Sequence, residues 1–211
     1  MHQRDHSWIS PEDYLAWERQ AETKNEFVNG EIIAMAGASP NHTLIAANTI
    51  IGLGSRLKGG PCRVHAGDLR VKVNPTGMYA YPDIVVVCGT PRFDEKQQDT
   101  LLNPTVLVEV LSKSTESYDR TTKFYHYRTL ESLSDYVLIS QDSALVEHRV
   151  RQTANRWLVS FYMGLEAAVP LGSLDCELPL AEIYDHIEWQ DEDAASGWLR
   201  AVKEPEATYA A

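Results

Sequence analysis

The sequence contains no long hydrophobic run, and its start, Met-His-Gln-Arg-Asp-His, lacks the apolar region of a secretory leader. We therefore expect no membrane-spanning segment and a cytoplasmic protein. Cysteine is scarce as well. Cys62, Cys88 and Cys176 stand far apart and show no Cys-x-x-Cys spacing, which disfavours a zinc site or a redox pair. We expect all of them to be reduced thiols in the core.

Basic residues are fewer than acidic residues. The chain has 19 Lys and Arg against 30 Asp and Glu, a formal net charge of −11 at pH 7, and this balance disfavours nonspecific binding to nucleic acid. The charge is uneven, however. Segment 56–72 carries five basic residues and one acidic residue, whereas segment 185–206 carries seven acidic and two basic residues. A locally positive face and chance clustering on a solvated surface both remain open readings.

The length of 211 residues and the hydrophobic content of 44% suit one globular domain with an appendage. We expect residues 1–190 to form the domain. Residues 191–211 are acidic and rich in alanine, so we expect a loosely ordered tail there.

The first third of the chain predicts two helices and a hairpin. Ser10 followed by proline indicates a cap and a helix over residues 11–22. Asn29-Gly30 between apolar segments is a strong hairpin signal, since both residues tolerate positive φ. A second helix, capped by Asn41, is expected to run to Gly59-Gly60.

The rest of the chain predicts mainly strands. They are expected at residues 62–73, 79–88, 105–111, 135–139, 144–150 and 156–162, with a surface loop at 89–104, a helix from 115 to 127 or 129, and a short helix near 180–186. This order favours an α+β fold with a mixed β-sheet flanked by α-helices.

Two acidic residues occupy positions that are otherwise apolar. Asp83 opens one apolar strand-like segment, and Glu109 interrupts another. A lone buried carboxylate is costly, so each needs a partner, a proton or a metal ion. Side chains alternate between the faces of a strand. If the two strands are neighbours, both carboxylates can therefore converge on one cation.

Such a pair of carboxylates suits a hard divalent cation. Mg²⁺ takes oxygen ligands and keeps several waters, so two carboxylates and a substrate phosphate are sufficient to bind it. A metal ion there activates water and neutralises charge on phosphate oxygens, and a nearby lysine adds electrostatic stabilisation. The sequence therefore indicates a metal-dependent hydrolase.

Three short motifs occur in order: Tyr81-Pro82-Asp83-Ile84, then Val108-Glu109-Val110-Leu111-Ser112, then Asp119, Lys123 and Tyr127. In this order and spacing the chain resembles the Uma-type restriction endonuclease family of the PD-(D/E)XK nuclease superfamily. The resemblance extends from about Ser10 to Tyr162. It implies a restriction-endonuclease-like fold for residues 1–190, a site for Mg²⁺ or Mn²⁺, and phosphodiester hydrolysis on DNA.

By this resemblance, Asp83 and Glu109 are the two acids of the motif and ligate the metal. The third position departs from the superfamily pattern, because Leu111 stands where the lysine is expected. Either another lysine takes over the role or the site is weakened. Our candidate is Lys123, whose long amine on the following helix can lean back over the end of the sheet. Lys113 is the competitor, although the chain is expected to bend away there.

Further residues are candidates for supporting roles. Glu26 matches an acid of the family pattern, and is either an extra ligand, a residue that holds a water, or a surface acid. His42 is either functional or a local hydrogen-bonding group near the start of the second helix. Tyr127 is expected to pack against the site or to support it. Lys123 has a simpler alternative role as the helical partner of Asp119, four residues earlier.

The lead hypothesis is a Mg²⁺- or Mn²⁺-dependent DNA endonuclease. Asp83, Glu109 and Lys123 form the core of its site, with Glu26 and His42 as additional residues. A homodimer is the expected assembly, because folds of this class often pair across a two-fold axis.

Two rival hypotheses are left open. In one, the nuclease fold has lost its activity and acts as a nucleic-acid-binding, structural or oligomerisation module. In the other, the chain is a structural or oligomerisation protein, in which Arg120, Arg70 or Lys72 forms ion pairs with the two motif acids and leaves no room for a metal ion.

Overall fold

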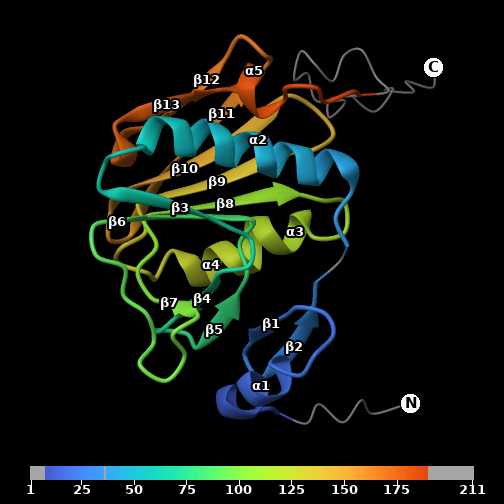
Figure 1. Ribbon diagram of the computed structural model, residues 1–211, viewed down its shortest axis with the longest axis vertical. Helices are drawn as coiled ribbons and strands as arrows, with labels where there is room; N and C mark the ends of the chain where they lie inside the picture. Colours follow the sequence, from blue (N-terminus) through green and yellow to red (C-terminus); the bar gives the residue numbers. More distant parts are fainter. Residues whose placement is uncertain (1–7, 36, 190–211) are drawn as a thin grey trace, which may run out of the picture.

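The computed structural model describes residues 8–35 and 37–189 (Figure 1). The tail predicted for residues 191–211 lies outside the described residues. The centre of the fold is a six-stranded mixed sheet. Across the sheet the strands follow in the order β11 (Arg156–Met163), β10 (Leu145–Thr153), β9 (Asp135–Ser140), β8 (Val106–Leu111), β6 (Ile84–Cys88) and β3 (Cys62–Ala66).

The two faces of this sheet are buried against different layers. Strands β8 and β9 are parallel, and the other pairs are antiparallel. In β6, Ile84 and Val86 belong to one hydrophobic cluster, whereas Val85 and Val87 belong to another on the opposite face. Burial on both faces explains why this strand is a continuous apolar run.

One face is covered by helix α2 (Pro40–Leu57) and by C-terminal elements (Figure 1). The latter are strands β12 (Ala168–Leu171) and β13 (Cys176–Pro179), the short 3₁₀ turn η2 (Gly172–Leu174) and helix α5 (Leu180–Ile183). The short helix predicted near 180–186 is therefore present. The predicted cap of α2 was wrong by two residues, because Ser39 rather than Asn41 accepts the N–H of His42, at 3.1 Å.

The other face is covered by a broken helix and a second sheet. The helix comprises α3 (Glu116–Tyr118), the π-helical segment η1 (Asp119–Lys123) and α4 (Phe124–Tyr127). The five-stranded second sheet has the order β2 (Glu31–Ala34), β1 (Asn25–Val28), β5 (Met78–Ala80), β4 (Arg70–Val73) and β7 (Thr100–Leu101). Strand β7 lies in the segment that was predicted to be a loop.

Helix α1 (Pro11–Glu18) packs against the second sheet, where Tyr14 contacts Phe27. Its cap at Ser10 is as predicted, but the helix ends four residues before the predicted position 22. The reason is local, since the Glu18 carboxylate accepts the backbone N–H of Asn25 at 2.9 Å and ties the chain into β1. The hairpin turn is confirmed at Asn29 and Gly30, whose φ angles are 51° and 86°.

The two long strands predicted for residues 62–73 and 79–88 were wrong, because each divides between the two sheets. The chain leaves β3 at residue 67 and leaves β5 at residue 81, and these crossings lie side by side. A Cβ added at Gly67 would lie 3.3 Å from the backbone oxygen of Asp83. Only a residue without a side chain allows this approach without displacing its neighbour. Asp83 is thus fixed at a point where the chain passes between the sheets.

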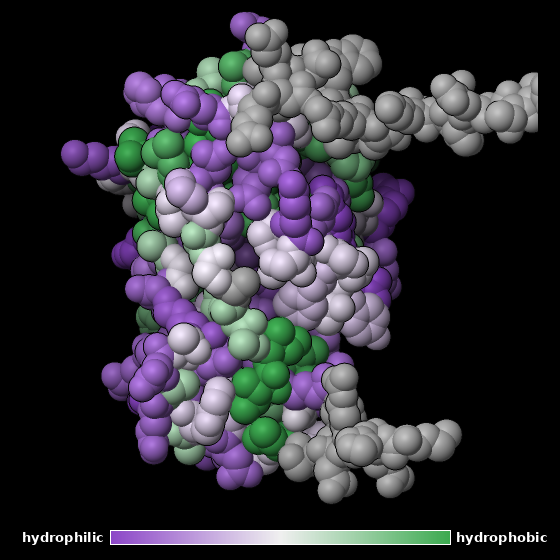
Figure 2. All heavy atoms as spheres, turned by 90° about the vertical axis from the view of Figure 1, so that its right-hand side faces the viewer, coloured by the Kyte–Doolittle hydropathy of each residue, from purple (hydrophilic) through white to green (hydrophobic). Residues whose placement is uncertain are grey.

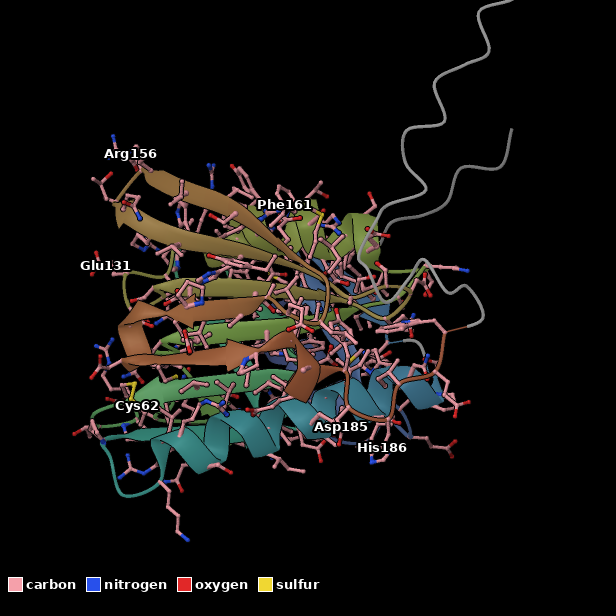
Figure 3. The ribbon with its side chains drawn as sticks, turned by 90° about the horizontal axis from the view of Figure 1, so that it is seen from above. Cys62, Glu131, Arg156, Phe161, Asp185 and His186 are labelled. Carbon is pink, nitrogen blue, oxygen red and sulfur yellow. A yellow bond between two sulfur atoms is a disulfide. The ribbon has the colours of Figure 1, made fainter. Side chains whose placement is uncertain are left out.

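The prediction that all cysteines are reduced was wrong for two of them. Cys62 and Cys88 form a disulfide, while Cys176 is free (Figure 3). The pair results from strand pairing, because Cys62 of β3 faces Cys88 of β6 in the antiparallel register. The sequence separation of 26 residues gave no sign of it. Separately, none of the helices within the described residues is long and apolar enough to span a membrane.

Candidate active site

Asp83 and Glu109 lie opposite each other where β6 and β8 pair. In the antiparallel register Val85 faces Leu107 and Ile84 faces Val108. One further step sets Asp83 against Glu109, on the face of the sheet that bears Val85. The structure thus brings together two acids that are 26 residues apart in the sequence, and both line one cavity of about 270 Å³.

The cavity lies between the two sheets, on the right-hand side of Figure 1. Its lining comes from the ends of β1, β2 and β8, the start of α2 and the helix α3–η1. Figure 2 turns this side toward the viewer, where a hydrophobic patch lies at the level of the β1–β2 hairpin below a largely hydrophilic upper part. Ile33, Ala34 and Met35 are among the apolar residues of the lining.

Lys123 enters this cavity from the π-helical segment. Its Nζ lies 3.1 Å from Oε1 of Glu109, 3.1 Å from Oε1 of Glu26 and 3.0 Å from Oδ1 of Asp119. The side chain is buried, with a residue exposure of 5%. A π-turn adds one residue to a helical turn and often marks a functional site. Here it directs both Asp119 and Lys123 at the sheet.

Glu26 comes from β1, in the second sheet. It is 2% exposed, so it is not the surface acid that the sequence allowed. Besides contacting Lys123, its carboxylate accepts the backbone N–H of Tyr81 at 3.2 Å. The site therefore spans both sheets, with Asp83 and Glu109 on one side and Glu26 on the other.

Each motif acid has one carboxylate oxygen without a hydrogen bond or an ion pair among the described residues. Oδ2 of Asp83 accepts the backbone N–H of Val110 at 2.7 Å and lies 3.3 Å from Nε2 of His42. Oε1 of Glu109 receives both Lys123 and the hydroxyl of Tyr127, the latter at 3.2 Å. Among the described residues, Asp83 Oδ1 and Glu109 Oε2 form neither a hydrogen bond nor an ion pair. Two unpartnered carboxylate oxygens thus remain available to a cation.

Comparison with known proteins identifies the family of this chain. The model of the Uma2 family, described as "putative restriction endonuclease", matches residues 11–181. The chain belongs to the Uma2 family.

Two proteins of Synechocystis sp. are similar to this Uma2 member. "Uncharacterized protein sll1609" is 35% identical over 161 residues, which cover 76% of this chain and 91% of the relative. "Uncharacterized protein slr1290" is 38% identical over 154 residues, covering 73% and 80% respectively.

A solved structure from Anabaena variabilis, described as "a putative nuclease belonging to DUF820", superposes with a TM-score of 0.70. It is 20% identical in sequence, and the match covers 83% of this chain and 97% of that one. The likeness establishes the fold. The predicted α+β architecture, a mixed sheet flanked by helices, is confirmed.

The electrostatics of this Uma2 site are dominated by negative charge. Burial raises the pKa of Glu109 well above its ordinary value; the Lys123 ammonium opposes this rise, and Asp119, Asp83 and Glu26 add to it. Burial alone would lower the pKa of Lys123, but Glu109 and Glu26 outweigh it and hold that pKa well above its ordinary value. Because the surroundings raise the pKa of both Glu109 and Lys123, the site favours bound protons or cations.

His42 lies beside Asp83 at the start of α2, where its side chain is 16% exposed. Burial would lower the pKa of the imidazole, but the hydrogen bond and charge of Asp83 raise it. The contact to Asp83 means that His42 is more than a local helix-cap group. Its Nε2 and the backbone N–H of Val110 approach the same oxygen of Asp83, Oδ2.

The sequence did not indicate one residue of the cavity, and it indicated another, Asp119, as part of the family motif and as the helical partner of Lys123. Tyr118 lines the cavity, where burial and the nearby charge of Glu26 raise the pKa of its hydroxyl. Asp119 is 3% exposed and close to Lys123, although its geometry is not that of a hydrogen bond. The four-residue spacing between Asp119 and Lys123 was the available signal. Nothing in the sequence pointed to Tyr118.

The ion pairs expected by the second rival hypothesis are not formed with the motif acids. Among the described residues Arg120 pairs with glutamates of α3 and β10, Arg70 with Asp99, and Lys72 with Asp94. The competitor Lys113 is exposed and does not line the cavity.

Leu111, at the usual lysine position, is 4% exposed within an apolar cluster. A lysine there would have to place its ammonium among hydrocarbon side chains, at a high desolvation cost.

The carboxylates of this site suit a metal ion that takes few ligands from the protein. Within the part of the chain that the structure describes, no three His, Cys, Asp or Glu side chains form a site by themselves. Mg²⁺ commonly binds through one or two carboxylates and completes its shell with water and substrate phosphate. The free oxygens of Asp83 and Glu109 match that requirement.

Proposed function

We propose that the protein is a divalent-metal-dependent endonuclease that hydrolyses phosphodiester bonds of DNA, with Mg²⁺ or Mn²⁺ held by Asp83 and Glu109. The observation that carries the proposal is the pair of unpartnered oxygens on these facing acids, beside a buried ammonium group. Membership of the Uma2 family, described as "putative restriction endonuclease", supports the substrate class.

A metal ion bound there would supply a Lewis acid that activates water and neutralises charge on the phosphate. The chain's own residues do the rest. Tyr127 and Lys123 both donate to Oε1 of Glu109, which leaves Oε2 without a hydrogen bond. The Val110 N–H and His42 fix Oδ2 of Asp83 in the same way. Both free oxygens are therefore oriented before a ligand arrives.

Lys123 is placed to stabilise negative charge on the scissile phosphate. Of its contacts to carboxylates, only the one to Glu109 has the geometry of a hydrogen bond. An ammonium group has three N–H donors, so it can also donate to a phosphate oxygen. Glu26 and Asp119 keep it charged by their proximity, and burial strengthens its field because water is excluded.

The alternative is a nuclease fold without turnover that binds nucleic acid or acts as a structural module. The observation that favours it is Leu111 at the superfamily's lysine position, together with a net charge of −11. Both functions allow metal binding, so only cleavage separates them.

The deciding experiment is a nuclease assay on supercoiled plasmid DNA with Mg²⁺, with Mn²⁺ and with EDTA. We expect nicked and linear products with either metal and none with EDTA. Asp83→Asn and Glu109→Gln, which keep the side-chain shapes, should remove the activity while circular dichroism shows the fold intact. Metal binding without cleavage would favour the alternative. Undiminished cleavage by both variants would reject the assignment.

A further inference from the structure

Strand β11 leaves one edge of the central sheet open. It is the first strand in the sheet order, and within residues 8–35 and 37–189 no strand pairs with its outer side. Figure 3 shows it along the outermost edge, with Arg156 at its start and Phe161 farther along. An open edge presents a row of unpaired N–H and C=O groups, which proteins usually protect with charges, proline or a bulge.

The middle of β11 has none of the protective residues. Segment 157–165 contains no charged residue and no proline. Four of its large apolar side chains are 45–56% exposed: Leu158, Val159, Phe161 and Met163. An uncharged, apolar edge of this length is typical of a surface that pairs with another strand.

The ladder between β10 and β11 shows which backbone groups point outward. The N–H of Gly164 donates to the carbonyl of Ala144 at 2.9 Å. The strand register is unchanged from there to the pair of His148 and Ser160. Hydrogen bonds alternate along an antiparallel ladder, so the even-numbered residues of β11 bond to β10. The odd-numbered residues therefore direct their N–H and C=O groups to the open edge.

We propose that β11 pairs in antiparallel fashion with β11 of a second copy of this chain, about a two-fold axis at Phe161. This register sets Phe161 opposite the partner's Phe161 and Val159 opposite the partner's Met163. All of these are odd-numbered positions, so their outward backbone groups meet as hydrogen-bonded pairs. The same residues share one face of the sheet, where their exposed side chains cover one another.

Charge identifies the second copy as the occupant. A net charge of −11 opposes self-association through most of the surface, but segment 157–165 is neutral. An axis at Phe161 sets the exposed apolar residues of the stripe against one another. An axis at Ser160 would join odd-numbered residues too, with Val159 opposite the partner's Phe161, and the cross-linking variants below separate the two registers. The stripe is thus self-complementary, as a two-fold interface requires.

Sedimentation velocity of the full chain over a micromolar concentration range tests the proposal without metal or DNA, so its outcome is independent of the nuclease assignment. We expect a dimer. Phe161→Asp sets two negative charges face to face on the axis and should raise the dimer dissociation constant at least about 100-fold. The control Ile51→Asp changes a side chain on α2 that is 65% exposed and should leave it unchanged. A monomeric parent chain, or an unaffected Phe161→Asp dimer, would overturn the proposal.

Two further variants cover misfolding and register. Met163→Lys replaces another exposed residue of the stripe and should also weaken the dimer, with circular dichroism reporting the fold. In a Cys176→Ser background, Phe161→Cys should cross-link under oxidation, because Cα atoms of a hydrogen-bonded pair lie about 5.5 Å apart, within reach of a disulfide. Ser160→Cys should not. Cross-linking through Ser160→Cys alone would reject the axis at Phe161.

Discussion

The ammonium of Lys123 donates a hydrogen bond to Oε1 of Glu109, 3.1 Å away, from the helix that follows the strand of Glu109. The nuclease superfamily pattern sets its lysine two residues after this acid, where the present chain has Leu111. Lys123 approaches the same carboxylate from the helix side of the sheet. In our proposal it therefore replaces the missing strand lysine.

Lys123→Ala should lower the rate of DNA cleavage by about 10²–10³-fold at saturating metal, the usual effect of removing one charge-stabilising donor. Metal affinity should change less, because the free oxygens belong to Asp83 and Glu109. Single-turnover rates and calorimetric metal titrations separate the two effects. Lys113→Ala, which removes an exposed lysine outside the cavity, is the matched control. Equal losses in both variants would show that the role of Lys123 is not specific.

The raised pKa of Glu109 predicts a pH-dependent stability for the metal-free protein. The folded state keeps a proton that the unfolded chain releases near the ordinary carboxyl pKa of about 4.3. The stabilisation is therefore complete below that pH and is lost as the pH rises through the raised pKa of the folded state. Urea unfolding in EDTA should show this decline, and Glu109→Gln should flatten it. A variant with the same slope as the parent chain would contradict the assignment.

His42→Ala should weaken metal affinity by about 10- to 100-fold, because the imidazole orients the carboxylate of Asp83. His42→Gln, which retains a donor, should recover part of the affinity. The control is His186→Ala, since the His186 side chain is 86% exposed. Calorimetry with Mg²⁺ measures all three variants. Unchanged affinity in His42→Ala would remove His42 from the site.

Gly67→Ala should slow cleavage by roughly tenfold without touching a catalytic group. The added methyl would lie 3.3 Å from the backbone oxygen of Asp83 and push that residue by a few tenths of an ångström. Gly54→Ala is the control, because a Cβ there meets nothing within 4 Å and should stabilise α2 by up to about 1 kcal/mol. Full activity in Gly67→Ala would show that the site tolerates displacement of Asp83.

The acids at the centre of the site were predictable because they break apolar runs. Asp83 and Glu109 were expected to converge if their strands were neighbours, and the register of β6 and β8 brings them together. Lys123 was selected from its place on the following helix. The roles proposed for these residues remain predictions, whereas their proximity is a feature of the structure.

Other features depend on contacts between distant segments. The burial of Glu26 follows from a second sheet that the periodicity of β1 does not reveal. Residues 62–73 look like one strand because apolar and polar side chains alternate in both of its halves, and only the close approach at Gly67 shows where the chain changes sheets. The pairing of Cys62 with Cys88 depends on register in the same way. Local sequence carries no information about such approaches.

The most direct test of the account is a calorimetric titration of the full chain with Mg²⁺, repeated with Asp83→Asn and Glu109→Gln. If the two free oxygens hold the ion, the parent chain binds it and each variant loses most of the affinity while remaining folded. Binding that persists in both variants, or no binding by the parent chain with DNA present, would contradict the central claim.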